Sequence, residues 1–340
     1  MTSSLHMHKE IYEQPAVLSA LLAKYLQDGS PAFLELKALP SPSHIVLLAC
    51  GTSFYACMSL ASLLVQKGID ARAYVASEYA KEKGRKLPPN TLAIGLSQSG
   101  ETTDTLNAMR LAKSQGASLL AICNTKSCSM FKEANYQIDL QAGREIGIAS
   151  TKAFCAQMLI ASLLALHFSG EKDPSLNQLP QIVQTCINKH AQIRRLSKRY
   201  LSQRGFFFIG SGLFYPLALE GALKLKETSY QQAQAHPSGE IRHGLIALAE
   251  PALATIALLP KGDELSYAVA SELAAKDSVL LAIASEEPSF ADDFLKLENA
   301  QNPLQEYFGA MVYLQLLALE IAHKSGLDVD KPRNLVKAVI

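Results

Sequence analysis

Residues 97–105 of this sequence gather hydroxyl side chains around one glycine, in the order Ser97-Gln98-Ser99-Gly100-Glu101-Thr102-Thr103-Asp104-Thr105. An apolar run typical of a buried strand precedes them, and helical periodicity follows. At such a turn the first helical N–H groups lack partners and attract an anion. Because no lysine or arginine lies within the stretch, hydrogen bonds would hold a phosphate there, and Gly100 would let the backbone approach it closely. The alternative is an ordinary N-cap and turn, where Ser and Thr are common for structural reasons alone.

A second stretch of the same kind lies nearer the N-terminus. An apolar run at 45–49 is followed by Cys50-Gly51-Thr52-Ser53 and by a helical pattern at 55–66. In one parallel sheet both loops would lie at the carboxyl ends of their strands, where open α/β sheets bind ligands. Two such loops converging on one phosphate are a more specific signal than either loop alone.

Three further positions carry groups that could transfer protons or form covalent bonds. Glu220, Lys224 and Glu227 share a helical face at i, i+4 and i+7, although spacing alone favours a solvated ion-pair stripe. His243 lies in the glycine-flanked sequence GEIRHG, where a histidine is either structural or functional. Lys337 lies near the end of the chain, where a lysine is ordinarily part of a solvated tail. Residue type alone does not decide any of the three.

The elements that would position these residues alternate between strands and helices, which predicts a doubly wound parallel sheet in each half of the chain. We expect a leading helical segment at 7–28, interrupted at Pro15, and a long helical stretch at 179–201 that serves as the connector. In the first half we expect strands near 45–49, 72–76, 91–96, 118–122 and 136–140, and helices near 54–67, 102–115 and 150–168. In the second half we expect strands at 206–209, 253–259 and 279–284, and helices at 217–229 and 304–323.

The two halves differ in their loops. Pro260-Lys261-Gly262-Asp263 stands in the second half where the hydroxyl stretch stands in the first. This asymmetry indicates a duplicated fold in which the first half binds the phosphate and the second half has another function.

Composition bounds the remaining possibilities. The 340 residues are 49% hydrophobic and 19% charged, with a net charge of +1, which is enough chain for two domains and gives no basic patch for nucleic acid. The six cysteines show no metal-ligand spacing, so we expect reduced thiols in a cytoplasmic protein. No secretory signal is evident, and the apolar runs are expected to be too short or too interrupted to span a membrane.

Six segments resemble the sugar-isomerase (SIS) family, in particular the isomerase half of its glutamine-dependent fructose-6-phosphate aminotransferases. They are ACGTS (49–53), SQSGETTDTL (97–106), EIGIASTKAF (145–154), ALEGALKLKE (218–227), GEIRHG (239–244) and DVDKPRNLVK (328–337). The resemblance covers nearly the whole chain from about residue 8 and keeps the order of the motifs. It implies two tandem, flavodoxin-like SIS domains, a homodimer with a shared active site, and a hexose or hexosamine 6-phosphate as ligand.

The same resemblance implies a domain division. It comprises an N-terminal helical segment (1–30), a phosphate-binding SIS domain (31–170), a helical connector (171–203), a second SIS domain (204–325) and an active-site tail (326–340).

Carried over position by position, the resemblance assigns roles to individual residues. Glu227 would move a proton between C1 and C2 beside Lys224, His243 would open the sugar ring in the neighbouring subunit's site, and Lys337 would form a Schiff base. No metal or organic cofactor is implied. The phosphate cradle would comprise Thr52, Ser53, Ser97, Gln98, Ser99 and Thr102. Residues beside the sugar would be Cys50, Gly51, Ile148, Ser150 and Val336.

The expected reaction is deamination of glucosamine 6-phosphate to fructose 6-phosphate and ammonia. The family's aminotransferases carry a glutaminase domain with an N-terminal cysteine, and Met1-Thr2-Ser3 offers no such nucleophile, so we expect no internal ammonia source. A deglycase acting on fructosamine 6-phosphates, or another phosphosugar isomerase, is the nearest alternative. A non-catalytic sugar-phosphate sensor would need the cradle, but not Glu227, His243 and Lys337 together.

Overall fold

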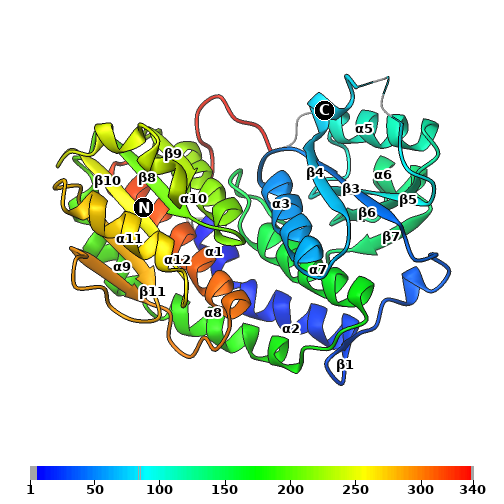
Figure 1. Cartoon of the computed structure of the whole chain (residues 1–340), viewed down its shortest axis with the longest axis horizontal. Coiled ribbons are helices and arrows are strands. Elements are labelled where there is room, and N and C mark those ends of the chain that lie inside the picture. Colours follow the sequence, from blue (N-terminus) through cyan, green and yellow to red (C-terminus); the bar gives the residue numbers. More distant parts are fainter. Residues whose placement is uncertain (1–5, 83, 85, 338–340) are drawn as a thin grey trace. The chain divides into compact units, whose positions relative to one another are not determined.

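The structure is a computed structural model that describes residues 6–82, 84 and 86–337. The chain forms two compact α/β units (Figure 1). The first unit contains Ala16–Glu145, Lys152–Asn177 and, at the end of the chain, Val336 and Lys337. The second contains the residues up to Pro15, the short segment Ile146–Thr151, and Gln178–Leu335.

The first unit is built on a parallel sheet whose strands lie in the order β4-β3-β5-β6-β7. Helices α4, α5 and α6 pack on one face of the sheet, and α3 and α7 lie against the other (Figure 1). The strands are β3 (His44–Ala49), β4 (Ala71–Val75), β5 (Thr91–Ser97), β6 (Ser118–Cys123) and β7 (Tyr136–Asp139). The helices are α3 (Gly51–Gln66), α4 (Ala76–Tyr79), α5 (Thr103–Ser114), α6 (Ser129–Glu133) and α7 (Lys152–Ser169).

The second unit repeats this design, with strands in the order β12-β11-β10-β8-β9, all parallel. Helix α11 covers one face, while α10 and α12 pack together in the same unit. The strands are β8 (Gly205–Gly210), β9 (Ala233–Pro237), β10 (Leu253–Leu259), β11 (Leu280–Ala284) and β12 (Asp293–Lys296). The long helices are α10 (Phe214–Ser229), α11 (Glu264–Ala274) and α12 (Pro303–Lys324).

The two sheets have the same topology. If the strands of each sheet are numbered along the chain, their order in space is 2-1-3-4-5. This is the flavodoxin-like order. The prediction of two tandem doubly wound parallel sheets is therefore confirmed. By this equivalence β5 and α5 of the first unit correspond to β10 and α11 of the second.

The connecting region is helical, as expected for 179–201, but it is divided into separate pieces. They are α8 (Leu179–Ile187), α9 (His190–Leu196) and the 3₁₀ turn η3 (Ser197–Tyr200). Each piece buries apolar side chains, including Ile182, Ile193 and Tyr200. A further 3₁₀ turn, η2 (Pro174–Gln178), precedes α8.

The leading segment forms α1 (His6–Tyr12) and α2 (Gln14–Tyr25), with Pro15 in the first turn of α2, where its missing N–H is harmless. The short pair β1 (Leu26–Gln27) and β2 (Ser30–Pro31) and the turn η1 (Leu34–Leu36) follow.

The apolar runs were expected to be too short or too interrupted to span a membrane, but helix α7 is long and apolar enough by length and composition. Its 18 residues have a mean hydropathy of 1.4. However, 83% of them are buried inside the protein, as in the core helix of an α/β unit.

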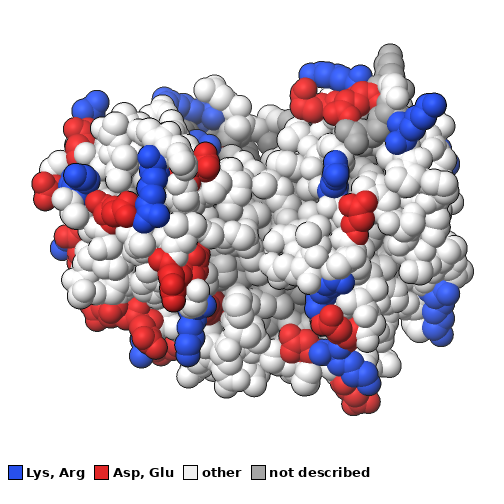
Figure 2. Space-filling model, in the orientation of Figure 1, with Lys and Arg blue, Asp and Glu red and all other residues white. Residues whose placement is uncertain are grey.

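On the face drawn in Figure 2, acidic and basic side chains are interspersed and neither sign forms a continuous area.

Candidate functional site

The first predicted phosphate loop is the start of helix α3. The helix begins at Gly51, three residues before the expected start near residue 54. Thr52 and Ser53 therefore lie in its first turn, where both are partly exposed. Gly51 has a φ of +54°, which favours glycine, and a side chain placed there would meet no atom within 4 Å. The N-cap residue Cys50 makes no side-chain capping hydrogen bond, and burial raises the pKa of its thiol. The start of α3 therefore has no capping bond from the side chain of its N-cap residue.

The second loop is folded by its own hydroxyls. Ser97, at the end of β5, accepts a hydrogen bond from the Gly100 N–H (3.1 Å) and lies 3.1 Å from the Thr102 hydroxyl. Ser99 accepts from the Glu101 N–H at 3.2 Å. Thr102 is the N-cap of α5, yet its side chain does not cap that helix. The ordinary side-chain N-cap considered from sequence is therefore not what this threonine forms.

The two loops lie at one edge of the sheet, because β3 and β5 are neighbouring parallel strands with Leu48 opposite Gly95. Two helix N-termini without side-chain caps thus start from adjacent strands, with Ser99 and Thr102 partly exposed beside them. Sequence reasoning missed Gln157 of α7, whose side-chain amide donates to the Ser53 hydroxyl at 2.8 Å. Its only signal is a polar residue within an apolar helix.

Packing beneath the loop requires glycine at position 100. A Cβ at this position would lie 2.3 Å from the Cys128 sulfur and 3.0 Å from that of Cys123. Gly100 is buried and has a φ of +69°. The hydrogen bond with Cys123 lowers the pKa of Cys128 to about 7, and the same contact together with burial raises the pKa of Cys123.

The equivalent loop of the second unit is closed by the protein's own carboxylates. Asp263 is the N-cap of α11 and accepts from the Ser266 N–H at 3.1 Å, at the position that Thr102 holds in the first unit. Glu306 of α12 accepts from the Lys261 N–H at 3.1 Å and from the Ser285 hydroxyl. Negative side chains thus take the hydrogen bonds that a phosphate would need.

Helix α10 carries the predicted acid–base group. The ammonium of Lys224 lies 2.5 Å from a Glu227 carboxylate oxygen and 3.4 Å from one of Glu220. The side chains of Lys224 and Glu220 are 1% and 2% exposed, so the solvated stripe favoured by spacing is wrong. Glu227 is 20% exposed and is the member of the group that a ligand in solvent can reach.

The other predicted residues are distributed over both units. In the second unit, His243 is exposed at the C-cap of the 3₁₀ turn η4 (Ser238–Arg242), which another turn, η5 (Leu245–Leu248), follows. Ile148 and Ser150, also in the second unit, are partly exposed in the segment Ile146–Thr151.

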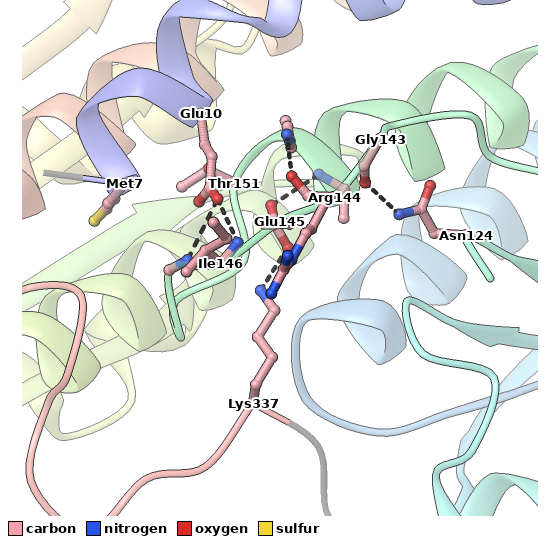
Figure 3. Close-up of polar contacts among 12 residues, drawn as sticks. Met7, Glu10, Asn124, Gly143, Arg144, Glu145, Ile146, Thr151 and Lys337 are labelled. Atoms are coloured by element: carbon pink, nitrogen blue, oxygen red, sulfur yellow. Dashed lines mark hydrogen bonds and ion pairs between the residues drawn. The ribbon is translucent and has the colours of Figure 1, made fainter. Parts of the chain in front are cut away.

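The chain end belongs to the first unit, where Val336 is exposed. Lys337 is not a freely solvated tail residue, because its ammonium lies 2.7 Å from a carboxylate oxygen of Glu145 (Figure 3). The other Glu145 oxygen accepts from the Ala153 N–H, in the first turn of α7, at 3.1 Å. Within the first unit, the structure therefore holds the hydroxyl cradle and an anchored Lys337. Within the second, it holds the buried Lys224 group, His243 and the Ile146–Thr151 segment.

Comparison with known proteins gives the family. The model of the SIS domain matches residues 38–167 and 200–318. The glutamine–fructose-6-phosphate aminotransferase (isomerizing) of Campylobacter jejuni is 44% identical over 345 residues, covering 98% of this chain and 58% of that protein. The same enzyme of Helicobacter pylori is 41% identical over 355 residues, with the same coverage. The chain thus spans 58% of the length of these relatives.

Solved structures agree with this result. The C-terminal domain of glucosamine-fructose-6-phosphate aminotransferase from Francisella tularensis superposes with a TM-score of 0.91 at 30% identity, covering 97% of this chain and 99% of that one. A glucosamine-6-phosphate deaminase from Thermotoga maritima superposes with a TM-score of 0.79 at 23% identity, covering 98% of this chain and 99% of that one, and this likeness shows the fold alone. With both halves matched by the family model and both sheets in the same order, the chain belongs to the SIS domain family.

Proposed function

We propose that this protein binds a hexosamine 6-phosphate and catalyses its isomerising deamination, converting glucosamine 6-phosphate to fructose 6-phosphate and ammonia. The observation that carries the proposal is the cradle at the ends of β3 and β5, where two helices start without side-chain caps beside exposed hydroxyls. Relatives at 44% and 41% identity are named as isomerizing fructose-6-phosphate aminotransferases, which supports this substrate class.

The cradle suits a phosphate held by neutral donors. The hydroxyls of Ser99 and Thr102 and the first N–H groups of α3 and α5 supply hydrogen bonds, and both helix dipoles favour negative charge. Binding a phosphate away from the reacting carbons would serve ground state and transition state alike, so it would lower KM more than it raises kcat.

Proton transfer is assigned to Glu227. After the ring opens, its carboxylate takes the proton from C2 of the amino aldose while the C1 carbonyl oxygen gains a proton, which gives an enolamine. Glu227 then returns its proton to C1, leaving an imine at C2 and a hydroxyl on C1. Lys224 supports this role because its ammonium, 2.5 Å from Glu227, orients the carboxylate.

Water then completes the reaction. It adds to the C2 imine, a proton moves to the nitrogen, and ammonia leaves as the ketone of fructose 6-phosphate forms. In buffer without added ammonium, water is in vast excess and mass action favours this direction; concentrated ammonium would drive the reverse. The amine of Lys337, once its proton has passed to the adjacent Glu145 carboxylate, would add to the open-chain C2 ketone of fructose 6-phosphate and release water as the Schiff base forms.

Ring opening is assigned to His243, in a homodimer whose subunits share their active sites. The residue is exposed at the end of η4, where its imidazole is available to an external ligand. The ring oxygen would receive a proton as the C1–O5 bond breaks and the C1 hydroxyl loses its proton, which leaves the open-chain aldehyde.

One assay tests the proposal: ammonia release by the purified chain from the 6-phosphates of glucosamine, galactosamine, N-acetylglucosamine and a fructosamine, with Glu227→Gln as the matched inactive control. We expect ammonia and fructose 6-phosphate from glucosamine 6-phosphate only. Release of an amino acid from fructosamine 6-phosphate would identify a deglycase. Tight binding of every sugar phosphate without turnover would favour the sensor, and glutamine-dependent synthesis of glucosamine 6-phosphate would contradict deamination.

A further inference from the structure

The sequence Lys9-Glu10-Ile11-Tyr12-Glu13-Gln14-Pro15 has no part in the reaction proposed above, yet it buries polar side chains. Glu10 of α1 is only 3% exposed, and Gln14, the first residue of α2, is fully buried. A buried carboxylate is costly unless it receives hydrogen bonds, so its partners indicate what it is for.

Those partners are backbone groups of the Ile146–Thr151 segment. One Glu10 oxygen accepts from the Ile146 N–H at 2.5 Å and from the Gly147 N–H at 3.3 Å (Figure 3). Gly147 makes this approach possible, because a Cβ there would lie 2.9 Å from the other Glu10 oxygen. The carboxylate therefore fixes the beginning of the segment.

The end of the segment is fixed by a second buried side chain. Gln315 of α12 donates to the Thr151 carbonyl at 3.4 Å, and the Gln14 amide donates to the Gln315 side-chain oxygen at 2.5 Å. All of these groups belong to the second unit. The residues between the two anchors, including Ile148 and Ser150, form no helix or strand, so side chains rather than a backbone ladder must set their conformation.

We propose that Glu10 is a positioning residue, which acts through Ile146 and Gly147 to hold Ile148 and Ser150 in the conformation that contacts the sugar. This inference rests on the proposed function, since it takes the ligand to be a sugar phosphate. Loss of Glu10 should weaken binding of the sugar's carbon chain, while the hydroxyl cradle of the first unit continues to bind phosphate.

The test compares two ligands by isothermal titration calorimetry. Glucitol 6-phosphate, an open-chain hexitol phosphate, probes the sugar and phosphate contacts together, and inorganic phosphate probes the cradle alone. Glu10→Ala should raise the dissociation constant of glucitol 6-phosphate by about tenfold or more, because a displaced contact segment is costly, and should leave that of inorganic phosphate unchanged. Glu10→Gln, which keeps an acceptor oxygen but not the charge, should give a smaller loss.

Two further variants keep the outcome interpretable. In Gly147→Ala the new Cβ would push the Glu10 carboxylate away from the Ile146–Thr151 segment. This variant should also lose affinity for glucitol 6-phosphate but not for inorganic phosphate, even if Glu10→Ala fails to fold. Glu13→Ala removes the same charge three residues further along the chain, from a carboxylate that pairs with the exposed Lys9. This variant should bind both ligands as the unaltered protein does.

The outcomes separate this inference from the function on which it rests. If the unaltered protein binds glucitol 6-phosphate and the Glu10 and Gly147 variants bind it equally well, or lose both ligands in parallel, the positioning role is overturned. If the unaltered protein binds inorganic phosphate but no sugar phosphate, the proposed function itself fails.

Discussion

The difference between the two strand-end loops predicts that one substitution raises the stability of the protein and lowers its affinity for phosphate. Thr102 and Asp263 are N-cap residues at equivalent positions of the two units, but only Asp263 caps its helix. Replacing Thr102 with aspartate would give the first unit the cap that the second unit has. The variant should therefore be more stable than the parent protein and, at the same time, should bind phosphate more weakly.

Both magnitudes follow from the geometry. Asp263 accepts from a first-turn N–H at 3.1 Å, and a side-chain cap of this kind is worth about 1 kcal/mol, or about 2–4 °C in the unfolding midpoint of a domain of this size. A carboxylate about 4 Å from a phosphate costs about 4 kcal/mol per unit of phosphate charge near a protein surface. If solvent screening removes half of this energy, phosphate affinity still falls by about thirtyfold.

Differential scanning calorimetry and titration with fructose 6-phosphate would measure the two effects on one preparation of Thr102→Asp. The matched control is the reciprocal change, Asp263→Thr, which should lower the unfolding midpoint of the second unit without weakening the ligand. Unchanged affinity in Thr102→Asp would mean that phosphate does not bind at the start of α5. Unchanged stability would mean that the first-turn N–H groups are already satisfied.

Four further predictions concern the reaction and the fold. Glu227→Gln keeps the shape of the side chain but cannot accept the C2 proton, so kcat should fall by about 10²–10⁴ while fructose 6-phosphate still binds in titration calorimetry. A verified mixed dimer of Glu227→Gln and His243→Ala chains should regain part of the activity, whereas equal inactivity would place the whole site within one subunit. Borohydride treatment with fructose 6-phosphate should add the sugar mass at Lys337, and Lys337→Arg should show no such adduct by mass spectrometry. Although burial raises the pKa of Glu320, hydrogen bonds from His190 and Lys324 lower it from 4.5 to about 2. Its contribution of about 3 kcal/mol should therefore be complete above pH 4.5 and lost as the pH falls toward 2, and urea titrations of Glu320→Gln should lack this acid dependence.

Continuous apolar runs gave the clearest strand signal. Central strands such as β3, β5 and β10 are buried on both faces and show it, while the edge strands β4 and β7 were also predicted, from mixed segments. The short pair β1 and β2 was missed, and so were β9 and β12, the two edges of the second sheet. An edge strand is less buried, and β9 carries Gln234, His236 and Pro237, residues that weaken the strand signal.

The candidate site was predictable where one residue type dominates a loop, and not where tertiary contact gives a residue its role. Clusters of hydroxyl side chains indicate the cradle from sequence alone. By contrast, the burial of Lys224 depends on how α10 packs, and spacing alone favoured a solvated stripe. The role of Gly100 depends on two cysteines that lie 23 and 28 residues further along the chain, at 123 and 128. Gln157 and Glu10 act on segments far from them in sequence, so no local pattern marks either residue.

A few side chains, rather than the fold, decide which unit can accept a phosphate. Both units present helix N-termini at the carboxyl ends of parallel strands, so both have the dipoles and N–H groups that attract an anion. In the second unit Asp263 and Glu306 already accept hydrogen bonds there, and their charges would repel an incoming phosphate. In the first unit Thr102 holds the position of Asp263, and its neutral hydroxyl would donate to a phosphate without adding negative charge at that position. A duplicated fold can thus keep the anion site in one copy and free the other copy for acid–base chemistry. The second unit meets the demand of that chemistry, because Lys224 is buried between two carboxylates of its own helix and only Glu227 reaches solvent.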